Sequence, residues 1–339
     1  MHISYRARRV LKNIGVIALA LLVAGIMIYL CWFTWLERYV VYTRDQGAVL
    51  DLSLDPHVPM GGEALPPERQ DVAIYYNEGE NAINTSRELT QLVGYYADGE
   101  QLSDMAMVQQ QIALLETGTP VMLDVKDAKG RFYYNSSLST ERKASIDPAA
   151  MDELIRQLDS KGMYLIARLP AFRDYAFGLS HTENGLFVSS GAYLWADDDY
   201  CYWLDPTKQG TITHLTEIVN ELKALGFDEV VFENFCFPPT DGLKFSGDRA
   251  QAINDAAATL VTSLSDQNFA VSFVSAQEGF VSPGGRTRVY LTNATAPQAP
   301  TLAQQTGVPD TAIGVVFLTE NHDTRFNEFS VLRPLDSAG

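Results

Sequence analysis

The sequence has little cysteine, little histidine and little basic charge. Its three cysteines are too few for a disulfide-rich scaffold, and its five histidines include no pair at the spacing of metal ligands. The formal net charge is −17, and so acidic a protein lacks the positive surface that nucleic acid requires. The sequence therefore predicts no metal site, no cofactor and no nucleic-acid partner.

Motifs of two common enzyme classes are also missing. No Gly-x-Ser-x-Gly elbow is present, which argues against a serine hydrolase. No glycine-rich phosphate loop follows the first expected strand, so a doubly wound open sheet is the weaker alternative for the fold. The 46% of apolar residues is ordinary for a globular protein of 339 residues, and no internal repeat is evident.

One segment near the N-terminus is unusually apolar. Residues 14–36 are 23 consecutive positions without a charge, and as a helix they would span about 34 Å, enough to cross a bilayer. Four basic residues precede the segment, and no acidic residue occurs before position 37. The positive-inside rule therefore places the N-terminus in the cytoplasm. Tyr29, Trp32 and Trp35 lie toward the outer end, where aromatic side chains favour the membrane interface.

The alternative for this segment is a cleaved signal peptide, with a shorter apolar core of about 7–15 residues and a small-residue cleavage site. Here the apolar run ends in the bulky residues 31–36. The sequence therefore predicts a single-pass protein of the plasma membrane with four parts. These are a cytoplasmic basic tail (1–13), a transmembrane anchor in the lipid bilayer (14–36), an extracytoplasmic stalk (37–70) and a folded extracytoplasmic domain (71–339).

The folded domain alternates short apolar runs with amphipathic segments, which indicates a parallel sheet covered by helices. Its roughly 270 residues are also the usual size of a (β/α)₈ barrel. Seven strands are expected, at residues 92–96, 121–125, 163–168, 229–233, 269–273, 289–291 and 313–318. An eighth lies either at 72–76 or near 329–332. The prediction is an α/β fold, a TIM-like barrel in which one strand is irregular or missing.

The expected helices carry start and stop signals. Ser103 and Asp147 are expected to cap two of them, with Pro148 in the first turn of the second. Gly162 and Gly226 are expected to end the second helix and a later one around Leu215.

In a barrel of this kind, side chains at the carboxyl ends of the strands carry the chemistry. Asp124, Arg168 and Glu233 end three successive expected strands. Glycoside hydrolysis needs two carboxyl groups, one to protonate the leaving oxygen and one to attack or to activate water. Asp124 and Glu233 are therefore the candidate catalytic residues, with Arg168 orienting a carboxylate. The alternative is that Asp124 and Arg168 form a structural ion pair.

A long irregular stretch, residues 170–206, mixes aromatic rings with carboxylates, a combination that suits sugars. Trp203 is the expected stacking platform. The His322–Asp323 pair is either an acid–base couple or an ordinary loop pair, and Cys201 and Cys236 are either a disulfide or two independent thiols. The candidate substrate-binding residues are Lys126, Arg168, Arg173, Asp174, Trp195, Trp203, Asp205, Asn234, His322 and Asp323.

Four stretches resemble the motifs of a known family. Residues 119–126 (TPVMLDVK) are similar to its second-strand motif, 164–174 to its third, and 225–232 with the following Phe237-Pro238 to its fourth. Residues 202–206 match a Trp-x-x-Pro loop between them. The family is the glycoside hydrolase-type TIM barrel of bacterial surface proteins, a domain of largely unknown function. The likeness covers about residues 90–330.

The resemblance implies a barrel related to sugar-cleaving enzymes and tethered outside a bacterial cell. Cys236 stands where the family's fourth-strand pattern has an arginine. If Glu233 is offset by one residue from the family's acid, it faces the helices and Asn234 takes the active-site position. The predicted function is a membrane-anchored glycoside hydrolase-like protein that acts on a carbohydrate or cell-surface polysaccharide. The alternative is a catalytically inactive barrel that binds a glycan or cell-wall polymer, or scaffolds a surface complex.

Overall fold

The computed structural model describes residues 22–29, 31–32, 35, 40–43, 47–50, 88–138, 145–274 and 276–338. The chain divides into two compact units, Met1–Glu80 and Asn81–Gly339. Each unit is described by itself below.

The N-terminal unit contains a helical stretch and a hairpin. Residues 22–29 are helical, and their apolar side chains are exposed; Ile28, for example, is 70% exposed. The strands β1 (Val40–Thr43) and β2 (Gly47–Leu50) pair antiparallel within the expected stalk. In the described part of the chain, no helix is long and apolar enough to span a bilayer. Most of the expected anchor, the whole of the basic tail and the alternative strand at 72–76 lie outside the described residues.

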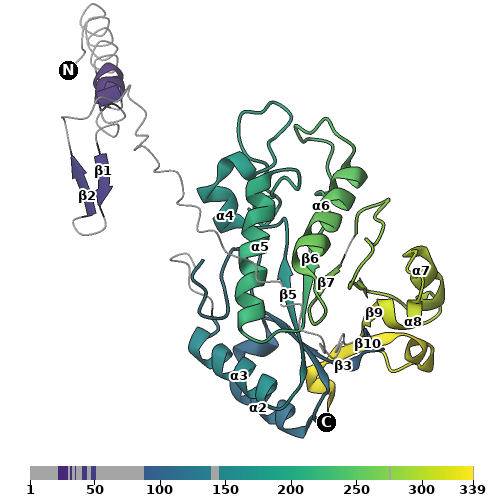
Figure 1. Cartoon of the computed structure of the whole chain (residues 1–339). Coiled ribbons are helices and arrows are strands. Elements are labelled where there is room, and N and C mark those ends of the chain that lie inside the picture. The colour runs from purple at the N-terminus through teal and green to yellow at the C-terminus, as the bar shows by residue number, and fades with distance from the viewer. Residues whose placement is uncertain are drawn as a thin grey trace, which may run out of the picture. The chain divides into compact units, whose positions relative to one another are not determined.

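The second unit is built around a closed barrel of eight parallel strands in the order β10-β3-β4-β5-β6-β7-β8-β9 (Figure 1). The TIM-like barrel predicted from the sequence is confirmed. The eighth strand is the C-terminal one, and the chain closes the barrel by pairing it with the first. The strands are β3 (Val93–Ala97), β4 (Pro120–Asp124), β5 (Tyr164–Pro170), β6 (Glu229–Glu233), β7 (Ala270–Phe273), β8 (Val289–Thr292), β9 (Val315–Leu318) and β10 (Ser330–Pro334).

Helices cover most of the barrel, and the two longest, α5 and α6, lie side by side (Figure 1). The helices are α2 (Met105–Leu114), α3 (Pro148–Ser160), α4 (Tyr175–Ser180), α5 (Gln209–Ala224), α6 (Arg249–Leu264), α7 (Ala299–Gln305) and α8 (Thr311–Gly314). The short 3₁₀ helices are η2 (Gln101–Ser103), η3 (Thr182–Asn184), η4 (Thr324–Glu328) and η5 (Leu335–Ala338).

Local sequence signals explain where these helices begin and end. The side chain of Asp147 accepts a hydrogen bond from the amide of Ala149 at the start of α3, as expected. The expected cap of α2 is wrong by one residue, because Asp104 accepts from Met107 while Ser103 belongs to η2. Gly226, with φ of +96°, follows α5 in the left-handed conformation that glycine tolerates best.

The alternation of side chains along the strands separates two apolar layers. The lumen is filled by residues such as Met122, Ile166 and Val231, whereas their sequence neighbours pack against the helices. The packing of these strands on both faces explains why their sequences are continuous apolar runs. Residues two positions beyond the lumen layer therefore also point inward, at the carboxyl ends of the strands.

One seam of the barrel is irregular. Strands β7 and β8 are paired at a single position, Phe273 with Val289. Among the described residues, no helix occurs between these two strands, which are connected by residues 274–288. The expected irregularity is therefore in the pairing of two strands, and all eight strands are present.

Candidate active site

Three of the predicted residues meet at the carboxyl end of the barrel. Asp124 ends β4 and is in register with Arg168 of β5, which in turn is in register with Val231 of β6. Glu233 lies two residues beyond Val231, and Val231 belongs to the lumen layer. Because side chains alternate along a strand, Glu233 also faces the lumen. The alternative in which Glu233 faces the helices and Asn234 replaces it is therefore wrong.

The carboxylate of Asp124 is held from two sides. Arg168 Nε donates to Oδ1 at 2.6 Å, and Arg168 Nη2 donates to Oδ2 at 3.1 Å. The backbone amide of Gly99, in the turn after β3, donates to Oδ2 at 3.0 Å. The Asp124 and Arg168 side chains are 20% and 13% exposed, respectively, so this bidentate pair is largely shielded from water. Asp124 therefore has a fixed orientation at the barrel mouth.

Glu233 differs sharply from Asp124. Its side chain is half-buried, and among the described residues no hydrogen-bond donor contacts its carboxyl group. Burial raises the pKa of Glu233, and the negative charge of Asp124 adds to that effect, while Arg168 and Arg173 oppose it. The net pKa is above the ordinary glutamate value. Burial thus favours the protonated form of Glu233, as a proton donor requires.

Arg173 connects the mouth to the long loop that follows β5. Its guanidinium bonds the carboxylates of Asp197 and Asp199, each at 2.6 Å. Burial raises the pKa of Asp197, but hydrogen bonds from Arg173, Cys201 and Trp203 outweigh it and bring the pKa to about 2. These ion pairs therefore fix the loop. Arg173 also lies close enough to Glu233 to lower the pKa of Glu233.

Two predicted binding residues lie in a separate buried cluster. Lys126 Nζ bonds Asp174 Oδ2 at 2.6 Å, and His214 Nε2 lies 3.3 Å from the same oxygen. Asp174 also caps α4, accepting from the amide of Phe177. Burial raises the pKa of Asp174, but the charge of Lys126 and the bond to His214 outweigh burial and hold it well below the ordinary value. Lys126 and Asp174 thus form an internal ion pair of 1% and 2% side-chain exposure.

The predicted aromatic platform is covered. Trp203 is 6% exposed, its indole N–H donates to Asp197 at 3.0 Å, and its ring meets half-buried Trp195 edge-on. Asp205 is buried and accepts from the amide and hydroxyl of Thr207, which is a local turn. The ring faces of Trp203 are therefore not open to a sugar, and Asp205 has a structural partner.

The remaining predicted residues lie at or beyond the strand ends. Asn234 follows Glu233 with φ of +51°, in the left-handed region that asparagine adopts more readily than most residues. His322 is exposed, and Asp323 pairs with Arg325 at 2.7 Å and caps η4. This Asp323–Arg325 pair agrees with the alternative in which His322 and Asp323 are ordinary loop residues. Cys201 and Cys236 are free thiols and form no disulfide.

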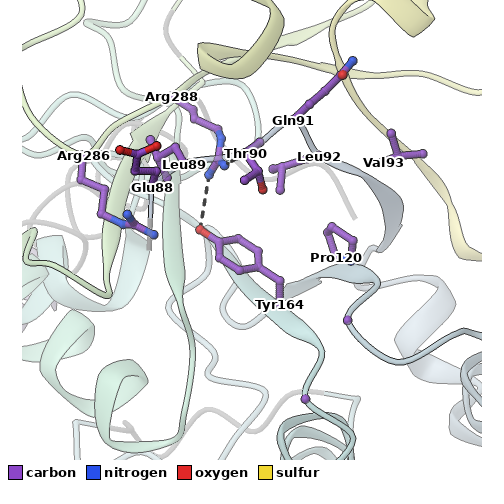
Figure 2. Close-up of a pocket in the computed structure, with 12 residues that line it drawn as sticks. Glu88, Leu89, Thr90, Gln91, Leu92, Val93, Pro120, Tyr164, Arg286 and Arg288 are labelled. Atoms are coloured by element: carbon purple, nitrogen blue, oxygen red, sulfur yellow. Dashed lines mark hydrogen bonds between the residues drawn. The ribbon is translucent and has the colours of Figure 1, made fainter. Parts of the chain in front are cut away.

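A charged cluster at the opposite end of the barrel was not predicted. Glu229 is fully buried and accepts hydrogen bonds from Arg288, Tyr164, Ser272 and Tyr290. Figure 2 shows Arg288 bonded to the hydroxyl of Tyr164. Both residues line a cavity of about 620 Å³. Sequence reasoning missed the cluster because Glu229 begins a strand and Arg288 precedes one, far apart in the chain. The active sites of such barrels lie at the carboxyl end, so this cluster at the opposite end fits a role in stability.

The fold and the site together define an eight-stranded parallel barrel with two carboxyl groups and an arginine at its carboxyl end. A family model described as "Putative glycosyl hydrolase domain" matches residues 94–276, more than half of the chain. The chain belongs to this family, as the resemblance implied. The matched region contains Asp124, Arg168 and Glu233. A search of the curated proteins finds no match.

Several solved structures are similar to this chain. A hypothetical protein from Ruminiclostridium thermocellum ATCC 27405 is 22% identical, with a TM-score of 0.45 over 53% of this chain and 96% of that one. The chitobiase of Flavobacterium johnsoniae is 12% identical, with a TM-score of 0.47 over 68% and 38%. An inactive mutant of an exo-β-N-acetylglucosaminidase from Vibrio harveyi is 10% identical, with a TM-score of 0.48 over 72% and 50%. The chain thus spans half or less of the length of these two glycosidases.

Proposed function

We propose that this protein is a glycoside hydrolase that uses Glu233 as the proton donor and Asp124 as the second carboxylate. The single observation that supports this most is the contrast between the two carboxyl groups. Glu233 is unpaired among the described residues and has a raised pKa, whereas Asp124 is held by Arg168 and by the amide of Gly99. Glycosidases need this difference between a protonated and a charged carboxyl group.

The proposed reaction assigns one step to each group. Glu233 gives its proton to the glycosidic oxygen as the bond from that oxygen to the anomeric carbon breaks. Asp124 either attacks the anomeric carbon, forming an ester that water then cleaves, or takes a proton from the attacking water. Arg168 keeps Asp124 oriented during this step, since a misplaced carboxylate would lose the benefit of proximity.

A second candidate function is a sugar-binding barrel without catalysis. One observation favours it: two donors from Arg168 and one from Gly99 occupy both oxygens of Asp124. A carboxylate in that state is a weaker nucleophile or base than a free one, because its charge is already neutralised. The cleft would then bind a glycan without cleaving it.

The cellular location belongs to the same proposal. Residues 14–36 would anchor the chain in the plasma membrane, with the N-terminus in the cytoplasm and the barrel outside. The uncharged sequence of this segment and the exposed apolar side chains of residues 22–29 support an anchor. An extracytoplasmic barrel would meet polysaccharides of the cell surface.

The test is hydrolysis of a glycan panel by the full chain in a mild detergent. Wild type should release sugar from at least one glycan, and Glu233→Gln and Asp124→Asn should each lower kcat by about 100-fold or more. Glu153→Gln, an exposed acid-to-amide change on α3, is the matched control and should leave the rate unchanged. Binding of a glycan without release of sugar from any member would support the second candidate and contradict the first.

A further inference from the structure

The long loop carries a hydrophobic groove of its own. A groove of about 780 Å³ is lined by residues of the stretch after β5, including Leu179, Tyr193, Trp195 and Tyr200. Within the described part of the barrel unit, six large hydrophobic side chains are strongly exposed, and three of them line this groove. Leu179 is 49% exposed, Tyr193 66% and Tyr200 79%. Such clustering marks a binding surface more than scattered exposure does.

The turn that displays Tyr200 is braced. Its backbone has φ of +57°, a conformation that costs energy for a bulky residue. The amide of Tyr200 donates to the carbonyl of Asp197 at 2.9 Å, and the Asp197 side chain accepts from the amides of Asp199 and Cys201. Arg173 adds ion pairs to Asp197 and Asp199. The protein thus maintains a strained backbone at the position from which the exposed Tyr200 ring projects.

The chemistry of the groove selects its ligand. Exposed tyrosine rings offer flat apolar faces with a hydroxyl at the edge, which suits the apolar faces and hydroxyl rim of a pyranose ring. The acidic run Asp197–Asp199 and the net charge of −17 oppose anionic polymers and anionic lipid surfaces. The groove therefore fits an uncharged glycan.

The groove and the carboxyl pair are connected through Arg173. Asp197 lines the groove and bonds Arg173, and Arg173 is close enough to Glu233 to lower its pKa. A ligand long enough to occupy both places would be a chain of several sugars.

We propose that the groove lined by Tyr193 and Tyr200 is a second glycan-binding surface, in addition to the candidate active site. The ligand of this surface is a neutral polysaccharide. The inference rests on the proposed function, because it takes the class of ligand from it. It goes further because it names the tyrosines of the loop as the binding residues and a polymer as the ligand.

The experiment is affinity electrophoresis of the full chain in detergent, in gels that contain soluble glucan, mannan, xylan or glycol chitin. The double variant Tyr193→Ala/Tyr200→Gly removes both rings, and glycine relieves the strain at position 200. We expect at least one polymer to retard wild type, an affinity about tenfold lower in the double variant, and a melting temperature that does not fall. Tyr193→Phe/Tyr200→Trp should retain binding, and Leu114→Ala, a change of similar exposure on α2, should match wild type.

The outcomes separate this inference from the proposed catalysis. Glu233→Gln should be retarded as strongly as wild type, and hydrolysis of a small aryl glycoside should be the same in the double variant. If no polymer retards wild type, or if the double variant binds as well as wild type, the groove is not a glycan site even if aryl glycosides are cleaved. If retardation depends on the tyrosines but nothing is cleaved, the groove is supported and the glycosidase is contradicted.

Discussion

The charge of Arg168 opposes the rise in the pKa of Glu233, and replacing Arg168 should shift the pH dependence of the proposed hydrolysis. Arg168 lowers the pKa of Glu233, which burial and Asp124 raise. An acid catalyst acts in its protonated form, so activity is present below this pKa and is lost as pH rises through it. In Arg168→Met the pKa of Glu233 rises further. The alkaline limb of the profile of kcat/KM against pH should therefore move to higher pH.

The size of the shift follows from the barrel geometry. Arg168 and Glu233 lie on neighbouring strands, about 4.8 Å apart, and are offset by two residues along them. Two residues span about 6.6 Å of strand, so the two backbone positions lie about 8 Å apart. At a charge separation of about 8 Å, one unit charge changes the energy by about 1 to 2 kcal/mol at an effective dielectric constant of about 20 to 40. A pKa change of one unit is about 1.4 kcal/mol. We therefore expect the limb to move upward by about one pH unit.

The assay is kcat/KM between pH 4 and 9, together with a ¹³C NMR titration of the labelled glutamate carboxyl groups, assigned with Glu233→Gln. Arg168→Lys keeps the charge and should leave the limb close to its wild-type position, although it loses the bidentate contact. Arg156→Met removes an exposed cation from α3 and should have no effect. A limb that stays in place or moves downward in Arg168→Met would refute the assignment of the proton donor.

Two further predictions concern stability and are measured by urea denaturation. Arg288→Met leaves Glu229 buried with only neutral donors, so the free energy of unfolding should fall by about 3–5 kcal/mol; a loss under about 1 kcal/mol would contradict the role given to this pair. Burial lowers the pKa of His214 in the folded state, so the unfolded chain binds more protons and stability decreases as pH falls through about 6.5. His214→Gln should lose less stability between pH 7.5 and 5.5 than wild type, and equal losses in the two proteins would show that another group is responsible.

The sequence was a good guide to the barrel because its strands are buried on both faces. Continuous apolar runs such as that of β6 predict the strand bounds directly, and helix signals such as Asp147 and Gly226 lie at the expected ends. The cap of α2 was missed by one residue because Ser103 and Asp104 are both good capping residues, and only the chain path selects one. An irregularity in the barrel was expected, but its position between β7 and β8 could not be predicted, since register depends on packing across the strands.

The site was predictable only where a residue's position in a strand fixes its direction. Asp124 and Glu233 end strands and Arg168 lies two residues before the end of β5, so their convergence followed from the fold. Trp203 and Asp174 lie in a loop, and nothing in the sequence indicates that one is covered and the other pairs with Lys126. The aromatic rings of this loop were expected to suit sugars, but the sequence did not show that Tyr193 and Tyr200 are the exposed rings and that Trp203 is covered.

The proton-donor role of Glu233 is the central claim, and leaving-group dependence tests it most directly. The measurement compares wild type and Glu233→Gln on two glycosides of the preferred sugar. In one the leaving group is dinitrophenol, and in the other it is the hydroxyl group of a second sugar. Dinitrophenolate leaves without protonation, so its release should be nearly unaffected by the variant, whereas release of the second sugar should slow by about 100-fold or more. An equal loss on both substrates, or no loss on either, would show that Glu233 does not donate the proton.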